Sequence, residues 1–345
     1  MKMSKEKILY GVDTTFEAVA KKATPKYKTT PGRLLFAGFM AGAFIAFGFI
    51  LAIVAGCIAK YPPFAAGDTF NKALFKILLG AVFPVGLIAV ILAGADLWTG
   101  NVQFLSAAKA KRYADFKSVL YNWFGSYGGN FIGSVFLALL AVPLTGLFGH
   151  VGDPNIFGST AVAIATGKVS KSILALFFLG IGCNWLVNVA IWQAARVQDG
   201  AGKILAIWFP IFAFVAIGFE HAIANMWAIP TGIIASNYAI TWSQFFHNVI
   251  PVTFGNAVGG FLFVAFYYWY LAHPEVGTSE IIKELVDFLV VFIVFWIIAT
   301  LIPAGIGIAL DKALGKGAMY VVPLVLTLYY IVGAFVLYKN NKAAA

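Results

Sequence analysis

Charged side chains are scarce in this chain. Aspartate, glutamate, lysine and arginine together make up 11% of its 345 residues, whereas soluble domains carry about 25%. This shortage excludes an ordinary soluble protein. Hydrophobic residues make up 61% of the chain and its mean hydropathy is +0.88. Both values indicate a polytopic membrane protein that lies in a lipid bilayer.

Cysteine is nearly absent as well. Cys57 and Cys183 each lie within an apolar run, so we expect neither a disulfide framework nor a cysteine metal site. The chain also lacks a phosphate-binding glycine loop, a cluster of metal ligands and a nucleophile with an adjacent base. We therefore expect no metal, no cofactor and no enzymatic activity.

Apolar runs without charge predict eight membrane crossings, because a helix needs about 20 residues to cross a hydrocarbon core about 30 Å thick. The runs are 34–59, 77–95, 118–152, 172–195, 204–219, 222–274, 288–310 and 317–338. With the N-terminus in the cytoplasm, 17 of the 24 lysines and arginines lie on the inner side, eight before residue 34 and nine later. This bias follows the positive-inside rule, so the net charge of +10 reflects orientation rather than nucleic-acid binding. We expect no removable signal peptide.

Two segments are too long for one crossing and too short for two. Residues 73–109 and 202–238 each comprise 37 residues, which would form a helix about 55 Å long. Glycine and an acid interrupt each segment in its middle, within Gly94-Ala-Asp-Leu-Trp-Thr-Gly-Asn101 and Gly218-Phe-Glu-His221. We interpret both as broken helices whose irregular backbone is buried in protein or lines a cavity. Two short spans joined by a loop at Glu220 are the rival interpretation of the second segment.

An internal repeat favours the broken helices. The matched residues are Gly94 with Gly218, Asp96 with Glu220 and Asn101 with Asn225 at an offset of 124, and Asn122 with Asn248, Asn130 with Asn256 and Gly133 with Gly259 at an offset of 126. Each repeat would hold three spans, an odd number, so the second would be inverted relative to the first. Paired broken helices in inverted repeats indicate a transport site near the membrane midplane.

The two ends of the chain lie outside this repeat. Before residue 31, apolar residues recur at roughly helical spacing among lysines, which fits either an amphipathic helix on the cytoplasmic surface or a solvated basic tail. After residue 273, the spans 288–310 and 317–338 contain no charged residue. We expect these last two spans to serve packing or contact with a partner.

The acid and the histidine at the second break are the strongest functional candidates. Glu220 is the only charged residue between positions 204 and 274, and a charge near the bilayer centre costs at least about 2.5 kcal/mol. A histidine in apolar surroundings is often a hydrogen-bonded core residue, but its place at the break favours a pore role for His221. For Glu220 and its counterpart Asp96 we favour support of the helix breaks over proton relay, because a free acid would repel an anion.

Other polar, basic and bulky residues near the breaks are further candidates. Thr99, Asn184 and Asn256 would hydrogen-bond either a neighbouring helix or a passing solute. Lys168 and Lys171, on the outer side, would either snorkel to the interface or line an electropositive vestibule. Candidate constriction residues are Phe83, Leu87, Leu97, Val187 and Phe214.

These motifs resemble those of the formate/nitrite transporter family. The match covers about residues 31–271 and rests on Gly94-Ala-Asp-Leu-Trp-Thr99, Asn184-Trp-Leu-Val-Asn-Val-Ala-Ile-Trp192, Ala213-Phe-Val-Ala-Ile-Gly-Phe-Glu-His-Ala-Ile-Ala-Asn225 and Asn248-Val-Ile-Pro-Val-Thr-Phe-Gly-Asn-Ala-Val-Gly-Gly260. The resemblance implies an aquaporin-like fold and a homopentamer with one pore in each protomer. It also implies passage of formate, nitrite or hydrosulfide, either as the anion or after protonation at a central histidine.

The resemblance further implies a role for individual residues. His221 would be the central pore histidine, and Thr99 its partner in the loop of the first break. Asn184 would face the pore, Asn256 would support the second break and Lys168 would be the outer lysine. The five bulky residues named above match the family's constrictions. The chain departs from the family pattern at three places, namely Trp98, Gly100-Asn101 and the two extra C-terminal spans.

We therefore expect an all-α polytopic membrane protein with an aquaporin-like inverted repeat of 3+3 helices, two broken helices and two extra C-terminal transmembrane helices. The expected parts are a cytoplasmic tail over 1–30, a six-span core over 31–273 and an extension over 274–345. The expected function is a channel or transporter for formate or a similar small monovalent anion, with pH-dependent passage through the central His221. The expected location is the cell membrane, with a cytoplasmic N-terminus. The alternatives are a nitrite or hydrosulfide channel, or a non-conducting membrane anchor for a formate-metabolising complex.

Overall fold

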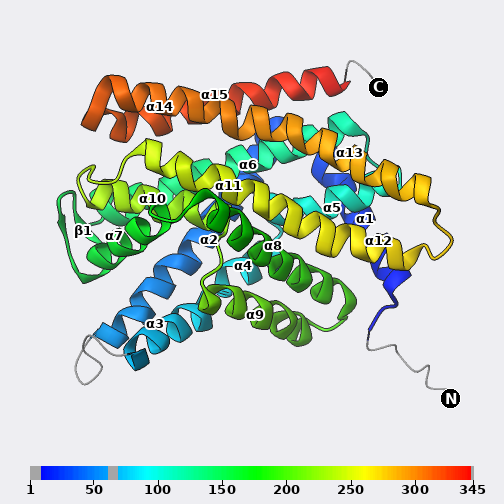
Figure 1. Cartoon of the computed structure of the whole chain (residues 1–345), viewed down its shortest axis with the longest axis horizontal. Coiled ribbons are helices and arrows are strands. Elements are labelled where there is room, and N and C mark those ends of the chain that lie inside the picture. The colour runs from blue at the N-terminus through cyan, green and yellow to red at the C-terminus, as the bar shows by residue number, and fades with distance from the viewer. Residues whose placement is uncertain (1–8, 61–68, 343–345) are drawn as a thin grey trace.

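The computed structural model describes residues 9–60 and 69–342, and within them the chain is almost entirely helical (Figure 1). The α-helices are α1 (Val12–Lys28), α2 (Pro31–Gly56), α3 (Thr69–Val82), α4 (Val85–Ala93), α5 (Trp98–Ala110), α6 (Phe116–Leu139), α7 (Ile156–Val169), α8 (Ile173–Arg196), α9 (Gly200–Ile217), α10 (Ala222–Ala235), α11 (Trp242–Gly260), α12 (Tyr267–Ala272), α13 (Thr278–Trp296), α14 (Ile302–Leu314) and α15 (Ala318–Lys342). The short elements are η1 (Cys57–Lys60), η2 (Leu140–Leu144), η3 (Phe261–Phe266), η4 (Ile297–Leu301), η5 (Gly315–Gly317), β1 (Gly149–His150) and β2 (Asp153–Pro154). The predicted all-α class is confirmed.

Within the described residues, seven helical stretches are long and apolar enough to cross a membrane. They are Pro31–Ala59, Asn71–Ala93, Phe116–Leu144, Ile173–Arg196, Gly200–Ile217, Trp242–Ala272 and Thr278–Asn341. The last stretch is 64 residues long, and the chain reverses within it near Gly315, which has a positive φ of 51°. The hydroxyls of Tyr329 and Tyr330 on α15 donate to the carbonyls of Ile298 and Ala299 in η4. This stretch therefore holds two antiparallel segments.

Both predicted helix breaks are present, and each starts at a glycine in the left-handed region. Gly94 ends α4 with φ +83°, and Gly218 ends α9 with φ +96°. Residues with a β-carbon rarely adopt this conformation, so glycine lets the backbone turn out of the helix. The following half-helices, α5 and α10, have 13 and 14 residues, about 20 Å each. Neither half-helix is long enough to cross the membrane alone.

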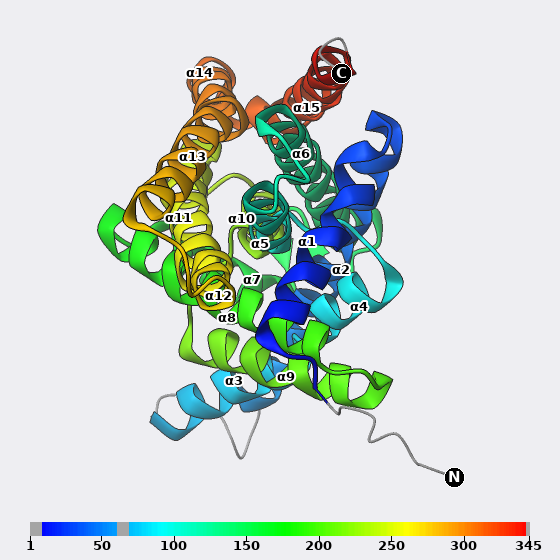
Figure 2. The ribbon, with the colours of Figure 1, turned by 90° about the vertical axis from the view of Figure 1, so that its right-hand side faces the viewer.

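The two half-helices lie at the centre of the molecule. Viewed end on, α5 and α10 are surrounded by the longer helices, with α1 and α2 on one side and α8 and α11 on the other (Figure 2). Glycines allow close packing in the surrounding helix pairs. A β-carbon at Gly133 of α6 would lie 2.0 Å from the Phe39 carbonyl of α2, and one at Gly259 of α11 would lie 2.3 Å from the Ile181 carbonyl of α8. The pairs α2–α6 and α8–α11 thus pack backbone to backbone at matched places.

Two helices add contacts that the sequence interpretation did not foresee. The helix α1 is present, but its residues Phe16, Val19 and Ala20 are 0–2% exposed and pack against protein instead of facing lipid headgroups or water. The helix α7 occupies part of what we expected to be an outer connection between spans, and it packs against α10. Each helix therefore brings a short segment inward toward one of the two half-helices.

Candidate functional site

Thr99 and His221 meet where the two helix breaks come together. The Thr99 Oγ1 and His221 Nε2 atoms are 3.0 Å apart, although the residues are 122 positions apart in the chain. Thr99 is 0% exposed and His221 is 3% exposed. The structure thus joins the two residues that the sequence interpretation placed at the pore centre, and it buries both.

A second hydrogen bond fixes the orientation of the His221 ring. His221 is the N-cap of α10, and its Nδ1 accepts the backbone N–H of Ala224 at 3.1 Å. A nitrogen that accepts a hydrogen bond carries no proton, so the neutral ring holds its proton on Nε2. The N–H that faces Thr99 is therefore a donor aimed at the point where the breaks meet.

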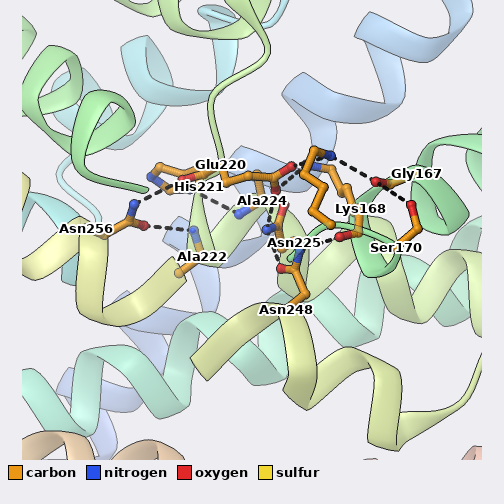
Figure 3. A network of polar contacts seen from close by, with 11 residues as sticks. Gly167, Lys168, Ser170, Glu220, His221, Ala222, Ala224, Asn225, Asn248 and Asn256 are labelled. Carbon is orange, nitrogen blue, oxygen red and sulfur yellow. Dashed lines mark hydrogen bonds and ion pairs between the residues drawn. The ribbon is translucent and has the colours of Figure 1, made fainter. Parts of the chain in front are cut away.

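Two asparagines hold the backbone of the breaks. Asn256 accepts the N–H of Ala222 at 2.8 Å and donates to the carbonyls of Gly180 and Glu220 at 2.8 and 3.0 Å (Figure 3). Asn130 makes the same three bonds at the first break: it accepts the Trp98 N–H at 2.9 Å and donates to the carbonyls of Gly38 and Asp96 at 2.8 and 3.0 Å. Each amide thus bonds one N–H and one carbonyl of the interrupted helix and ties the break to a carbonyl of a neighbouring helix, Gly180 of α8 or Gly38 of α2.

The acids at the breaks pair with lysines. Glu220 contacts Lys168 at 2.9 Å and Lys171 at 3.0 Å, and the Glu220 side chain is only 2% exposed. At the first break, Asp96 contacts Lys26 at 2.8 Å. The carboxylates therefore contact lysines and the neighbouring Asn101 and Asn225, while the asparagines described above bond the backbone N–H groups.

The lysine at the first break was missed from the sequence. Lys26 belongs to α1, and its carbonyl accepts the Asn122 side chain at 3.2 Å. Lys168 belongs to α7, and its carbonyl accepts the Asn248 side chain at 3.0 Å. The two lysines thus have equivalent partners in the two halves of the chain. Asn122 and Asn248 are matched by the repeat, and this match was the only sequence signal that could have drawn attention to Lys26.

A cavity of about 790 Å³ leads to His221 from the side of Lys168. Phe83 and Phe214 line it next to His221, with ring centroids 5.7 Å apart, and the Phe214 ring lies 6.0 Å from the His221 ring. The cavity also contains Lys72 and Lys76 of α3. An anion that enters this cavity would pass lysines, then two phenyl rings, before it reaches the imidazole.

The remaining predicted site residues are buried around this point. Asn184 donates to the Thr99 carbonyl at 3.2 Å and to the Asn256 carbonyl at 2.6 Å, so it links the two breaks. Its Oδ1 atom has no hydrogen-bond partner among the described residues. Leu87, Leu97 and Val187 are 1–3% exposed and do not line the outer cavity. The structure therefore places only Phe83 and Phe214 of the five predicted constriction residues at this cavity.

The described residues contain no group of three or more His, Cys, Asp or Glu side chains that could hold a metal ion. The described residues do provide the buried imidazole of His221 and the buried hydroxyl of Thr99. Lysines line the outer part of the cavity, and the phenyl rings of Phe83 and Phe214 lie next to His221. This arrangement defines a class, a membrane protein with buried polar residues at two helix breaks and a cavity that leads to them.

The comparisons with known proteins identify the family. Residues 13–270 match the model described as "Formate/nitrite transporter". The chain is 44% identical to a "Probable formate transporter" of Methanothermobacter thermautotrophicus over 74% of this chain and 94% of that protein, and 41% identical to "Formate channel BtFdhC" of Bacillus thuringiensis over 73% and 92%. A solved structure, "Pentameric formate channel with formate bound", is similar with a TM-score of 0.59 and 29% identity over 70% of this chain and 97% of that chain. The chain belongs to the formate/nitrite transporter family.

Proposed function

We propose that this protein is a channel for formate and similar small monovalent anions, which pass between Thr99 and His221. The observation that carries the proposal is the cavity that ends at His221, where a ring N–H and a hydroxyl meet 3.0 Å apart in a buried place. A formate oxygen can accept both donors, and hydrogen bonds to a charged acceptor are stronger than those between neutral groups. The names of the two relatives and the bound formate of the solved structure support formate as the first substrate.

Proton transfer at His221 is the proposed means of crossing the apolar part of the path beyond the imidazole. Formic acid has a pKa of about 4, as carboxylic acids do, so the neutral acid is scarce at pH 7. Protonation of His221 places a second proton on Nδ1 and so breaks the bond from the Ala224 N–H. The ring then gives its Nε2 proton to a formate oxygen, which leaves formic acid and a neutral ring with its proton on Nδ1. The neutral acid then crosses the apolar surroundings beyond His221 without the cost of moving a charge through them.

The test is flux into liposomes that contain the purified protein. Labelled formate should enter faster as the external pH falls, and the internal pH should fall with it. Competition with nitrite and with hydrosulfide ranks the three anions. A protein that reconstitutes intact but carries none of the three would exclude the channel and favour a membrane anchor without conduction.

The lysines of α3 are the proposed anion collectors of the outer cavity. Lys168 and Lys171 share the Glu220 carboxylate, so these three side chains together contribute one net positive charge. Lys72 and Lys76 are exposed, line the same cavity and make no ion pair with the described residues. A β-carbon placed on Gly218, the glycine of the second break, would lie 3.9 Å from the Lys76 Nζ. The Lys76 ammonium is therefore close to this break. Two of the three net positive charges of the cavity therefore come from α3.

Replacing both α3 lysines should weaken anion capture without stopping conduction. In the Lys72→Met, Lys76→Met variant, we expect formate uptake at low concentration and low salt to fall roughly tenfold, because electrostatic steering raises encounter rates by about 10–1,000-fold. The loss should shrink at high salt, where charges are screened. Uptake is measured in liposomes at two salt concentrations. At about 10 mM the Debye length is about 30 Å, and at about 500 mM it is well below 10 Å.

Lys312 and Lys316 provide the matched control for this experiment. Lys316 is exposed in η5, Lys312 is exposed in α14, and neither lines the cavity. The Lys312→Met, Lys316→Met control therefore removes two positive charges on the same expected side of the membrane. We expect its uptake to equal that of the unmodified protein at both salt concentrations. An equal loss in the control, or no loss in the α3 variant at low salt, would show that α3 does not collect the anion.

The proposed setting is a homopentamer in the cell membrane with a cytoplasmic N-terminus. The solved relative is described as pentameric, and the bias of lysine and arginine favours this orientation. The proposed parts remain the tail, the six-span core and the C-terminal extension, since the family match ends at residue 270. Mass measurement of the detergent-solubilised complex tests the assembly.

A further inference from the structure

The segment after the family match packs against the first helix break. We call α13, η4, α14 and α15 (278–342) the C-terminal hairpin; it lies along one side of the molecule (Figure 1). The family match ends at residue 270, so no role for this hairpin follows from membership of the family. Its contacts with the half-helix that carries Thr99 suggest one.

Phe295 of α13 is fully buried against Trp98, the residue that precedes Thr99. The two rings are stacked with centroids 5.2 Å apart and an interplanar angle of 14°, and both residues are 0% exposed. Tyr127 packs edge to face on Trp98 at 5.2 Å and on Phe295 at 5.5 Å. The Trp98 indole, with its large surface, is thus held between α6 of the core and α13 of the hairpin.

The hairpin also holds the other end of the same half-helix. Lys109, in the last turn of α5, contacts Asp287 of α13 at 2.5 Å. Trp123 of α6 donates to the Asn101 carbonyl at 3.1 Å and packs edge to face on Phe295 at 5.6 Å. The helix α13 therefore contacts α5 at its first residue and at its last turn.

The corresponding place at the second break is built differently. The residue that starts α10 is Ala222, whose counterpart at the start of α5 is Trp98. Alanine has no side chain long enough to reach an outer helix. The first break therefore carries a large aromatic ring that packs against the hairpin, and the second break has no equivalent of this ring.

The far end of the hairpin is anchored as well. Asp311 of α14 is 9% exposed and accepts the backbone N–H of Ser243 at 3.0 Å, and it also accepts the hydroxyls of Ser243 and Tyr238. Both ends of the long helix α13–α14 are thus tied to the core. A helix fixed at both ends can hold the Phe295 ring in one position against Trp98.

From these contacts we propose that the C-terminal hairpin sets the position of Thr99 by packing Phe295 on Trp98. Phe295 is a positioning residue, because it acts on the pore through Trp98. Thr99 is one of the two donors at the narrow buried site, so a shift of its backbone changes the distance between Thr99 and His221. The consequence is a change in which anion passes and in how its passage depends on pH. Measuring anion selectivity and its pH dependence rests on the proposed function, whereas the position of the first break can be measured even if the protein carries no anion.

The first test is hydrogen–deuterium exchange of the purified protein. In Phe295→Ala, the space left beside Trp98 should let the break open more often, so that amides of 94–101 exchange at least about tenfold faster. Phe292→Ala is the control: Phe292 lies one turn earlier in α13, is 1% exposed and packs edge to face on Phe254 of α11 at 5.0 Å, and its ring lies 6.2 Å from that of Phe295. The control should leave exchange over 94–101 unchanged. Equal exchange in both variants would overturn the proposal even if the protein carried no anion.

The second test separates positioning from general damage to the protein. A purely structural loss lowers formate and nitrite uptake in proportion, because fewer channels are intact. Phe295→Ala should instead change the ratio of formate to nitrite uptake at least about threefold, and Phe295→Leu should recover part of the ratio by refilling most of the space. In a Trp98→Ala background, Phe295→Ala should have no further effect on the ratio. An unchanged ratio, or additive effects of the two substitutions, would contradict the proposal.

Discussion

Formate uptake by a His221→Asn variant should fall about 100-fold at pH 7 and lose its dependence on pH, because a positioned proton donor contributes about 10²–10⁴-fold. Asparagine is a good N-cap residue, so its side chain can take over the bond from the Ala224 N–H that His221 accepts in the structure. The variant therefore removes the titratable ring and retains the cap of α10. Uptake of labelled formate and the internal pH of the liposomes are recorded together at several external pH values.

Two further variants distinguish the proton donor from the cap. His221→Ala removes both functions, and the lost cap should cost about 1 kcal/mol of stability; its uptake should be as low as that of His221→Asn. His150 is exposed in β1, away from the breaks, and His150→Ala should behave as the unmodified protein. Uptake that still rises as pH falls in His221→Asn would show that the proton does not come from this ring.

Local patterns sufficed to place the breaks. Gly94 and Gly218 stood out because a glycine followed by an acid in an apolar segment is a poor choice for a lipid-facing helix. Both glycines have the positive φ that only glycine adopts readily. The repeat matched the two breaks to each other, but it did not pair Thr99 with His221. That pairing came from the resemblance to the formate/nitrite transporter family, and the structure places the two side chains 3.0 Å apart.

The support of the breaks could not be predicted in the same way. Lys26 lies in a basic N-terminal region where each lysine is explained by membrane orientation, so nothing in its neighbourhood marks it as the partner of Asp96. The partner is 70 positions away, and only the folded α1 brings the two together. The same holds for Lys168, whose partner Glu220 is 52 positions away.

The role of the asparagines shows a second limit of the sequence. Asn256 was assigned both to the pore and to the second break, since an amide serves either purpose equally well. In the structure, its Oδ1 accepts one bond and its Nδ2 donates two. The two donors of its amide are therefore both used by backbone carbonyls. A side chain engaged in this way holds the protein together and has no free donor left for a substrate.

Asn256→Leu should for this reason destabilise the protein more than it alters the selectivity of its pore. Leucine is similar in size but bonds neither the Ala222 N–H nor the Glu220 carbonyl at the break, and each buried group without a partner costs about 1–3 kcal/mol. The expected loss is at least about 2 kcal/mol, and Asn130→Leu should cause a similar loss because Asn130 makes the equivalent three bonds at the first break. Unfolding of the purified protein in denaturant measures both losses.

The control for this experiment is a surface asparagine whose side chain also makes three bonds to backbone groups. Asn155 is exposed; it accepts the N–H groups of Phe157 and Gly158 and donates to the Leu147 carbonyl. Water can replace these three bonds, so Asn155→Leu should cost only about 1 kcal/mol, the usual cost of a lost N-cap. If Asn256→Leu were as mild as the control while formate uptake by the intact protein collapsed, Asn256 would belong to the pore rather than to the support of the break. A large loss of stability, with an unchanged ratio of formate to nitrite uptake in the surviving fraction, would instead assign Asn256 to the framework that brings His221 to Thr99.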